Sequence, residues 1–348
     1  TFDNNVNFFY GKNGSGKSNL LEAIHYLINV KSFRESSIND LIQWNKDKFT
    51  IKGEVEGLNF FDQLEIDFCD GKRILKKNHK IIRNLSDYHE DISSVSFSPK
   101  DIELIKGEPR IRRKFFDRAI YSVKNSYLDN YLNYFRVIKN KNKILLSSHK
   151  QDEIDPWLIK QAEIGSELFV SRFNIINDIL PIIKNTFSRI TKKDDVIDVI
   201  YTPSGISIEE IGTKDINLIK KEFYEKLKQY YYKEKNIGFS IIGPHRDNFD
   251  IYINGKSSKN FSSQGESKSI TIAFKLAEVI NFKEKKEEFP IFIIDDFSSE
   301  IYSERKTILL DYLMNNNIQL FISATSDKEM QKTEKTSFYQ IDKGKTVI

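Results

Sequence analysis

The stretch of this sequence that most restricts its fold is Gly11-Lys12-Asn13-Gly14-Ser15-Gly16-Lys17-Ser18. It matches the phosphate-binding template G-x-x-x-x-G-K-[ST] at every fixed position. The glycines permit backbone conformations of positive φ, in which successive N–H groups can point at one anion. Lys17 supplies a charge for the β- and γ-phosphates of a nucleotide, and Ser18 supplies a hydroxyl for Mg²⁺.

Both flanks of this phosphate loop fit the same interpretation. Val6–Tyr10 predict a buried strand, and residues 18–27 carry apolar side chains at helical spacing. A helix that begins at the loop favours phosphate through its dipole. The order strand, glycine loop, helix therefore predicts a nucleotide site in an α/β domain rather than a chance glycine-rich turn. The strand begins within a few residues of Thr1, so we expect a fragment that lacks an N-terminal strand or hairpin.

Length and composition limit the class of protein. The 348 residues are enough for two or more domains, at roughly 150 residues each. The net charge of +4 is too small to indicate nucleic-acid binding by itself. Cys69 is the sole cysteine, which excludes disulfides, zinc ribbons and Cys-x-x-Cys redox chemistry. The sequence contains no apolar stretch of about 20 residues and no signal peptide, so we expect a cytoplasmic protein without a membrane partner.

A pair of acids near the end of the chain complements the phosphate loop. The apolar run 289–294 ends in Asp295-Asp296. An acid at the carboxyl end of a buried parallel strand can reach a Mg²⁺ ion held by Ser18, and a neighbouring acid can polarise the attacking water. We therefore assign Asp295 to the metal and Asp296 to catalysis. The alternative is that the two acids cap the following helix.

The elements between these motifs predict one sheet interrupted by an insertion. Alternating strands are expected at 49–56 and 61–68, a third strand of the same meander at 72–77, and long helices at 108–124, 127–146 and 156–190. Further strands are expected near 196–201, 206–209, 239–242 and 249–253. We thus expect three parts: the N-terminal half of an ATPase lobe (1–97), an inserted and mainly helical lobe (98–236), and the C-terminal half of the ATPase lobe (237–348).

A second glycine-containing loop precedes a helix expected at 267–282. It consists of Ser263, Gln264, Gly265 and Glu266. Its serine and glycine can donate hydrogen bonds to phosphate oxygens at a helix N-terminus. Equally, Ser263 can be an ordinary N-cap, with Glu266 completing a capping box. The residues alone leave both interpretations open.

Taken together, these motifs resemble the RecF family, bacterial recombination-mediator ATPases related to ABC and SMC head domains. The resemblance covers almost the whole chain. Besides residues 11–24 and the acid pair, it depends on Phe97-Ser98-Pro99, residues 104–109, Arg112–Arg118, Gly243-Pro244-His245-Arg246-Asp247 and Ser263-Gln264-Gly265. It implies an α/β fold, the ABC/SMC-type P-loop ATPase head, with an inserted, mostly α-helical lobe.

The resemblance also implies a function. Ser263 and Gly265 would belong to a signature loop, residues 263–266, that binds the γ-phosphate of ATP held by a second copy. The expected protein is an ATP- and Mg²⁺-dependent homodimeric clamp with weak DNA-dependent ATPase activity. It would bind single- and double-stranded DNA near gaps and help to load RecA, with RecO and RecR as partners. The alternatives are an ABC transporter ATPase subunit, an SMC-like head and a P-loop kinase.

The residues that would contact DNA are less distinctive. Arg34, Arg110, Arg112 and Arg113 are the candidates, together with the basic segment Lys72–Arg83. Such clusters also fit an ordinary solvated helix face or a lysine-guarded sheet edge.

Three positions depart from the family pattern. Glu266 stands where glutamine is usual, Tyr302 where aspartate is usual, and Thr325 where a histidine would sense the γ-phosphate. These departures affect the expected hydrolysis rate and dimer strength more than the expected fold.

Overall fold

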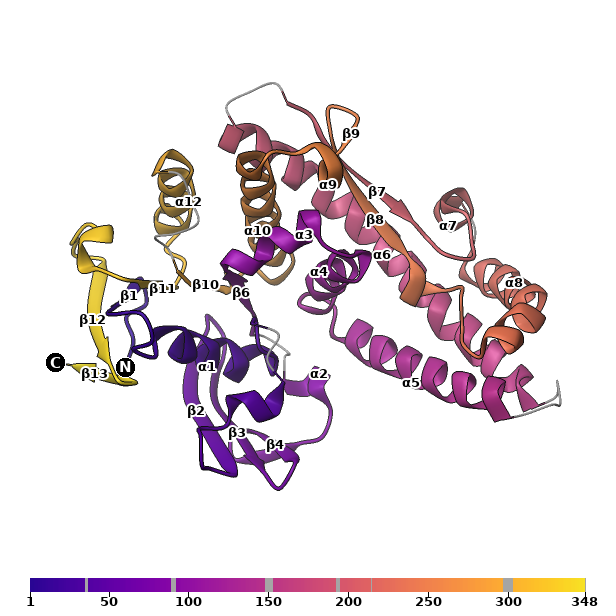
Figure 1. The fold of residues 1–348 in the computed structure, drawn as a ribbon, viewed down its shortest axis with the longest axis horizontal. Coiled ribbons are helices and arrows are strands. Elements are labelled where there is room, and N and C mark those ends of the chain that lie inside the picture. Colours follow the sequence, from indigo (N-terminus) through magenta and orange to yellow (C-terminus); the bar gives the residue numbers. More distant parts are fainter. Residues whose placement is uncertain are drawn as a thin grey trace. The chain divides into compact units, whose positions relative to one another are not determined.

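Strand β1 (Val6–Tyr10) lies inside a six-stranded sheet of order β13-β12-β1-β11-β10-β6 (Figure 1). In this computed structural model the described residues are 1–34, 37–88, 92–147, 153–191, 195–213, 215–296 and 303–347. The other strands of the sheet are β6 (Ser94–Phe97), β10 (Ile291–Ile294), β11 (Leu320–Ala324), β12 (Thr336–Asp342) and β13 (Lys345–Val347). β1 pairs in parallel with β11 and β12, β10 pairs in parallel with β11 and β6, and β13 is antiparallel to β12.

The parallel register brings several strand ends to one edge of this sheet. Tyr10 lies opposite Ala324, while Ile294 lies opposite Ile322 and Phe97. The central strands β1, β10 and β11 are mostly apolar, as expected where both faces of a parallel sheet are covered. Loops that follow the carboxyl ends of such strands form the usual ligand-binding edge.

The chain folds into two units. The first comprises Thr1–Glu103, Asn185–Lys193 and Ser263–Ile348, and the second comprises Leu104–Lys184 and Asp194–Ser262. The residues of the second unit lie in the sequence between β6 and β10. These two strands are neighbours in the six-stranded sheet. The expected insertion into one sheet is therefore confirmed. No helix among the described residues is long and apolar enough to cross a membrane.

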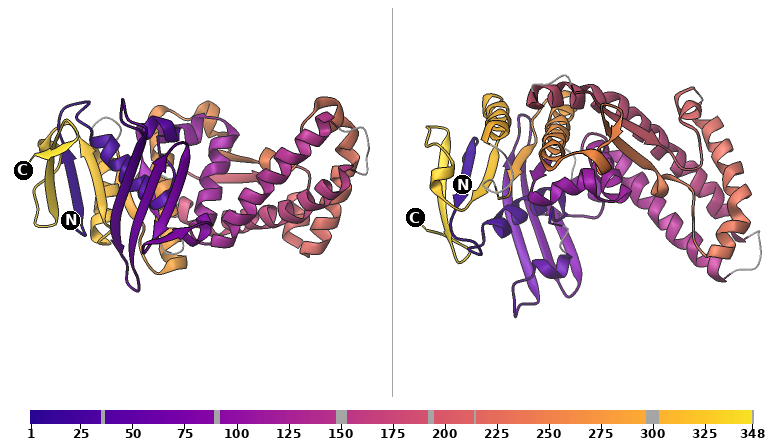
Figure 2. Two further views of the ribbon diagram at one scale, coloured as in Figure 1. Left: turned by 90° about the horizontal axis from the view of Figure 1, so that it is seen from below. Right: turned by 45° about the horizontal axis from the view of Figure 1, so that its top comes forward.

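Helix α1 (Lys17–Asn29) packs between two sheets of the first unit. One side contacts β11 and β6, and the other contacts an antiparallel sheet of order β2-β3-β4-β5 (Figure 2). Tyr26, Leu27 and Ile28 of α1 are buried with Leu64 and Ile66 of that sheet. Its strands are β2 (Lys48–Glu56), β3 (Phe61–Cys69), β4 (Lys72–Lys77) and β5 (Lys80–Ile82). The first three match the predicted strands.

The remaining elements of the first unit are mostly helical. They are η1 (Ile38–Leu41), α2 (Leu85–Tyr88), η2 (Pro99–Ile102), α10 (Gln264–Lys286), α12 (Ser303–Asn315) and η5 (Asp327–Glu329). α10 packs against β6 and α12. The ammonium of Lys275 in α10 lies 2.7 Å from a carboxylate oxygen of Asp101, and the Lys275 side chain is only 2% exposed.

The second unit is helical with a small antiparallel sheet of order β7-β8-β9. Its elements are α3 (Glu103–Lys106), α4 (Pro109–Tyr121), α5 (Asn125–Ser147), most of α6 (Asp155–Thr191), β7 (Ile197–Thr202), α7 (Ile208–Thr213), α8 (Ile216–Ile237), η4 (Pro244–Arg246), β8 (Asn248–Ile253), β9 (Lys256–Ser257) and α9 (Ser258–Phe261). The end of α6, from Asn185 onward, belongs to the first unit.

A buried charge network joins α4, α5, α6 and β7 of the second unit to Asp247, the residue before β8. The Arg172 guanidinium on α6 donates two hydrogen bonds to the Asp117 carboxylate on α4, at 2.9 and 3.0 Å. It donates a third to Asp247 Oδ2 at 2.6 Å, and the hydroxyls of Tyr127 and Tyr201 donate to the same two carboxylates. Burial raises the pKa of Asp247 to about 6, while the Arg172 charge opposes that rise. A buried charge is tolerated when it is paired and hydrogen-bonded in this way.

One segment predicted as a strand is helical. Residues 206–209 lead into α7 because Ser207 and Glu210 form a reciprocal cap. The Ser207 N–H donates to Glu210 Oε2 at 2.7 Å, and the Glu210 N–H donates to Ser207 Oγ at 3.2 Å. A local side-chain cap thus replaces the expected strand pairing.

A second predicted strand, 239–242, is also wrong. The Ser240 N–H donates to Asn142 Oδ1 and the Ile241 N–H donates to Glu234 Oε1, each at 2.8 Å. Both acceptors are side chains of long helices, so these backbone groups are unavailable for a ladder.

The unit boundaries differ from the expected ones at 97, 236 and 237. Residues 237–262 belong to the second unit, since β8 pairs with β7 along Ile197–Thr202. The return to the first unit falls at Ser263, directly before α10.

We predict that Arg172→Met lowers the free energy of unfolding by about 3–5 kcal/mol, because it leaves Asp117 and Asp247 buried without a counter-charge. Urea denaturation followed by circular dichroism measures the change. Lys184→Met is the control, because Lys184 and Asp198 form an exposed pair whose loss costs at most about 1 kcal/mol. Equal unfolding midpoints for the two variants would contradict the structural role of Arg172.

Candidate nucleotide-binding site

The phosphate loop, residues 11–18, connects β1 to α1. Gly16 is the residue before the helix and has φ of 104°, a conformation that residues with a Cβ rarely adopt. At Gly11 a Cβ atom would lie 2.3 Å from the Ile341 carbonyl oxygen, so neighbouring backbone excludes a side chain there. The motif glycines are therefore required by backbone geometry at this turn.

Lys17 and Ser15 are the buried polar side chains of the loop. The buried Lys17 ammonium donates to the carbonyl oxygens of Gly11 and Lys12, at 2.7 and 2.9 Å. Burial lowers the pKa of Lys17, and the charges of Asp295, Asp296 and Glu329 oppose the shift. Ser15 Oγ is buried and has no hydrogen-bond partner among the described residues. An unsatisfied buried hydroxyl beside a lysine fits a site built for an anion. Lys12, Asn13 and Gly14 form the exposed part of the loop.

The hairpin between β12 and β13 lies against the phosphate loop. The Gly344 N–H donates to the Ser15 carbonyl oxygen at 2.7 Å. A Cβ at Gly16 would lie 2.9 Å from Gly344 Cα, so two glycine backbones meet at this point.

Ser18, Asp295 and Ser323 form the polar centre of the site. The Ser18 and Ser323 hydroxyls both donate to Asp295 Oδ1, at 2.8 and 2.7 Å. Asp295 directly follows β10 and is 8% exposed. The two residues that the sequence assigned to a metal, Ser18 and Asp295, are therefore in direct hydrogen-bond contact. Ser323 near the end of β11 was not predicted, because the sequence does not reveal that β11 is the neighbour of both β1 and β10.

Asp296 adopts an unusual backbone conformation. Its φ is 57°, in the left-handed region that few non-glycine residues occupy. Its N–H donates to Ser323 Oγ at 2.9 Å, so Ser323 contacts both members of the acid pair. Backbone conformations of this kind often occur at functional sites.

Thr325 donates two hydrogen bonds to the carboxylate of Glu329. Its hydroxyl donates to Glu329 Oε1 at 2.8 Å, and its N–H donates to the same oxygen at 3.1 Å. A role for Thr325 in sensing phosphate would require it to exchange this partner. Tyr302 lies outside the described residues.

The signature loop, residues 263–266, lies at the N-terminus of α10 and forms a capping box, which is one of the two interpretations of this sequence given above. The Ser263 N–H donates to Glu266 Oε2 at 2.7 Å, and the Glu266 N–H donates to Ser263 Oγ at 3.2 Å. The Glu266 carboxylate thus folds back onto its own helix. Ser263 is exposed, and its hydroxyl hydrogen remains available to an acceptor. Arg305 on α12 donates to the Gly265 carbonyl oxygen at 2.9 Å, a contact that no sequence signal indicated.

Two of the four arginines proposed for DNA are structural. Arg112 is 4% exposed and donates to the Gly107 carbonyl oxygen at 3.1 Å. Arg113 donates to the Asp247 carbonyl oxygen at 2.6 Å, and burial lowers its pKa. Arg34 is half-exposed and tied to α1, whereas Arg110 is exposed. We therefore retain only Arg34 and Arg110 as candidates.

Two of the six cations in the basic segment Lys72–Arg83, Lys76 and Lys77, pair with acids of the same sheet. The Lys76 ammonium lies 2.6 Å from Glu65 and 2.8 Å from Asp67, and Lys77 pairs with Asp62 at 3.1 Å. For Lys76 and Lys77, these contacts favour a charge-paired sheet face over a surface for phosphates.

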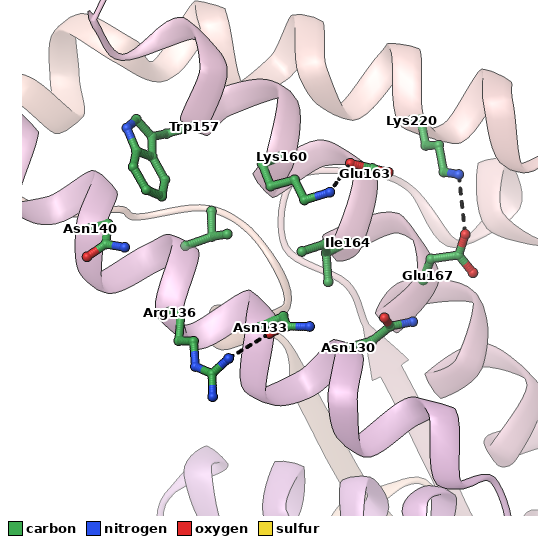
Figure 3. Close-up of a pocket in the computed structure, with 11 residues that line it drawn as sticks. Asn130, Asn133, Arg136, Asn140, Trp157, Lys160, Glu163, Ile164, Glu167 and Lys220 are labelled. Carbon is green, nitrogen blue, oxygen red and sulfur yellow. Dashed lines mark hydrogen bonds and ion pairs between the residues drawn. The ribbon is translucent and has the colours of Figure 1, made fainter. Parts of the chain in front are cut away.

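A pocket of about 510 Å³ lies between α5, α6 and α8 of the second unit (Figure 3). Its charged groups face one another: Lys160 lies 2.7 Å from Glu163, and Lys220 lies 3.3 Å from Glu167. Arg136 donates to Asn133 at 3.1 Å. The paired charges leave no group here that resembles a nucleophile or a general base, so we assign the pocket no chemistry.

The parallel sheet, the phosphate loop, the acid after β10 and the helical insertion define an ABC/SMC-type P-loop ATPase head. Comparison with known proteins agrees. The family described as RecF/RecN/SMC N terminal domain matches residues 1–347. The DNA replication and repair protein RecF of Geotalea daltonii is 32% identical over 345 residues, which are 98% of this chain and 93% of that protein. The chain belongs to this family, among the RecF proteins.

Solved structures support the same assignment. A structure of the recombination mediator protein RecF with ATP has a TM-score of 0.91 and 28% identity, covering 100% of this chain and 92% of that one. An SMC head bound to the C-terminal winged-helix domain of ScpA has a TM-score of 0.55 and 15% identity over 99% of this chain and 89% of that one, a likeness in fold alone.

We predict that Lys17→Ala weakens binding of a nucleoside triphosphate by about tenfold or more, because hydrogen bonds to charged groups contribute about 1.5–3 kcal/mol each. Isothermal titration calorimetry measures the affinity. Lys46→Ala is the control, since its side chain is exposed and lies outside the phosphate loop. Unchanged affinity in Lys17→Ala would refute the assignment of the loop.

Proposed function

We propose that this protein is an ATP-dependent DNA clamp of replication and recombinational repair, in which ATP joins two copies and slow hydrolysis separates them. The observation that carries the proposal is the hydrogen bond between Ser18 Oγ and Asp295 Oδ1 at the mouth of the phosphate loop. It joins the hydroxyl and the carboxylate that a P-loop ATPase uses around its metal. The likeness to RecF over nearly the whole chain supports ATP as the nucleotide.

The donor atoms present fit Mg²⁺. A hydroxyl and a carboxylate are the oxygen ligands that this ion prefers. The described ranges contain no group of three or more histidines, cysteines or acids placed to hold a metal ion. The remaining ligands would therefore be phosphate oxygens and water, as is common for Mg²⁺. When bound, the ion would neutralise charge on the phosphates.

The side chains then take distinct roles. Lys17 would leave its two carbonyl acceptors to pair with the β- and γ-phosphates. Asp296 would accept the proton of the attacking water, and Ser323 would hold both acids in position. The signature loop, residues 263–266, would bind the γ-phosphate held by the other copy, with Ser263 as a hydroxyl donor at the start of α10.

The signature loop suits this role despite its acid. Glu266 is turned back into the capping box, which directs its charge at the Ser263 N–H. The Arg305 guanidinium at Gly265 adds a positive charge beside the loop. Both features lower the electrostatic cost that glutamate would impose near a γ-phosphate.

The partners follow from the same family. We propose single- and double-stranded DNA near gaps as the ligand of the ATP-bound dimer, RecO and RecR as protein partners, and loading of RecA as the outcome. Arg34 and Arg110 are the remaining arginine candidates for phosphate contacts.

We predict that Asp296→Asn retains ATP but slows its hydrolysis by about 10²–10⁴-fold, the usual contribution of general base catalysis. Phosphate release in a single turnover measures the rate. Asp295→Asn should instead weaken Mg²⁺-dependent nucleotide binding, which separates the two acids. Wild-type turnover in Asp296→Asn would remove its catalytic role.

We predict that Ser263→Arg leaves ATP binding by the monomer intact and abolishes both ATP-dependent dimers and DNA retention, because a bulky side chain blocks the γ-phosphate of the other copy. Sedimentation velocity with and without ATP, DNA and Mg²⁺ measures both properties. Gln43→Arg, an exposed site in the first unit, controls for the added charge. A wild-type protein that stays monomeric with ATP and DNA would refute the clamp.

A further inference from the structure

The hairpin of β12 and β13 lies beside β1 and extends beyond its end (Figure 1). Tyr10, the last residue of β1, lies opposite Gln340, whereas β12 continues to Asp342. Asp342 pairs with Lys345 across the two-residue turn Lys343-Gly344. The phosphate loop, which directly follows Tyr10, therefore meets this turn at the same edge of the sheet.

Two contacts join the turn to the phosphate loop. The Gly344 N–H donates to the Ser15 carbonyl oxygen at 2.7 Å. A Cβ at Gly16 would lie 2.9 Å from Gly344 Cα, so the backbones of the two glycines are packed against each other. The hairpin is itself anchored, because Ile341 is buried in one hydrophobic cluster with Leu21 of α1. A fixed hairpin therefore holds the Ser15 carbonyl group in one direction.

The direction of that carbonyl group determines the direction of a neighbouring N–H group. In a planar trans peptide the C=O and N–H bonds point in nearly opposite directions. Since the Ser15 carbonyl points at the hairpin, the Gly16 N–H of the same peptide points away from it. Gly16 directly precedes α1, and the first N–H groups of a helix have no partner within the helix. In a phosphate loop such N–H groups surround the anion.

Gly16 does not fix the orientation of this peptide by itself. Its φ is 104°, but glycine adopts positive and negative φ about equally well. The Ser15–Gly16 peptide could therefore rotate by half a turn without a clash from a side chain at Gly16. A rotated peptide would direct its carbonyl oxygen at the phosphates in place of the N–H, and the two groups would repel each other.

We propose that the turn Lys343-Gly344 positions the phosphate loop for nucleotide by preventing this peptide flip. Gly344 is then a positioning residue, which acts through the Ser15–Gly16 peptide. Without the tie, only the molecules with the correct peptide orientation would bind nucleotide, which raises the apparent Kd. The inference rests on the proposed function for the identity of the nucleotide, and it concerns binding by a single copy of the chain.

The turn Asp70-Gly71 between β3 and β4 is a matched control. Asp70 and Gly71 have φ of 52° and 72°, close to the 47° and 76° of Lys343 and Gly344. A Cβ at either glycine would meet no described atom within 4 Å. One substitution should therefore strain the two hairpins equally. Of these two turns, within the described residues, only Lys343-Gly344 has a backbone hydrogen bond to the phosphate loop.

Calorimetric titration with ADP and with adenosine 5′-(β,γ-imido)triphosphate, in Mg²⁺, tests the proposal together with steady-state ATPase assays. Gly344→Val should weaken binding of both nucleotides about five- to tenfold, because a β-branched residue disfavours positive φ and the hydrogen bond to Ser15 is lost. KM for ATP should rise by a similar factor, while kcat stays within about twofold. Gly344→Asn should bind within about twofold of wild type, because asparagine tolerates this conformation and retains the N–H.

Gly71→Val should leave both affinities within about twofold of wild type, since it strains a hairpin away from the loop. Thermal melting shows whether each variant is folded. If Gly344→Val unfolds, Gly344→Ala is compared with Gly71→Ala, and the former alone should weaken binding by about threefold. Equal binding by the paired Gly344 and Gly71 variants would overturn the inference, as would a lower kcat at unchanged KM.

The outcome is separable from that of the proposed function. If the wild-type protein binds neither nucleotide, the inference and the proposed function both fail. If it binds nucleotide and Gly344→Val binds equally well, the inference is wrong while the clamp survives. If Gly344→Val alone loses affinity but the wild-type protein never dimerises with ATP and DNA, the clamp is wrong while the inference stands.

Discussion

The site depends on a hydrogen bond between residues that are 277 positions apart, Ser18 and Asp295. One such bond contributes only about 1.5–3 kcal/mol even when one partner is charged. It cannot itself hold the two ends of the chain together. The parallel sheet does so, because β11 pairs on one side with β1 and on the other with β10. The polar centre is therefore a consequence of strand order, and Ser323 on the central strand joins both acids.

The cations of this chain serve two physically different purposes. Arg172, Lys141 and Arg112 are almost fully buried and stabilise the second unit through carboxylates and carbonyl oxygens. A count of positive charges along the sequence treats them as surface groups. Only the fold separates them from exposed cations such as Arg110 and Lys226, which can meet an anionic ligand without a conformational change.

Local motifs predicted the fold. The glycine pattern of residues 11–18 and the acid after a buried apolar strand also allowed Ser18 and Asp295 to be assigned to one metal site, and the structure brings these two residues into contact. Ser323 could not be assigned to the site, because the sequence does not show that β11 lies between β1 and β10. The contact of Arg113 with the Asp247 carbonyl oxygen and that of Arg305 with Gly265 also depend on tertiary packing. Residues 206–209 were predicted as a strand, but the cap formed by Ser207 and Glu210 begins helix α7 there instead.

The close contact of Gly344 with Ser15 and Gly16 ties the phosphate loop to the hairpin that follows β12. A fluorophore attached at the neighbouring Lys343 would sit beside the loop without altering any of its residues. Its emission would then report filling and emptying of the loop in real time. The same proximity means that a bulky purification tag joined directly after β13 would disturb the pocket it was meant to leave untouched.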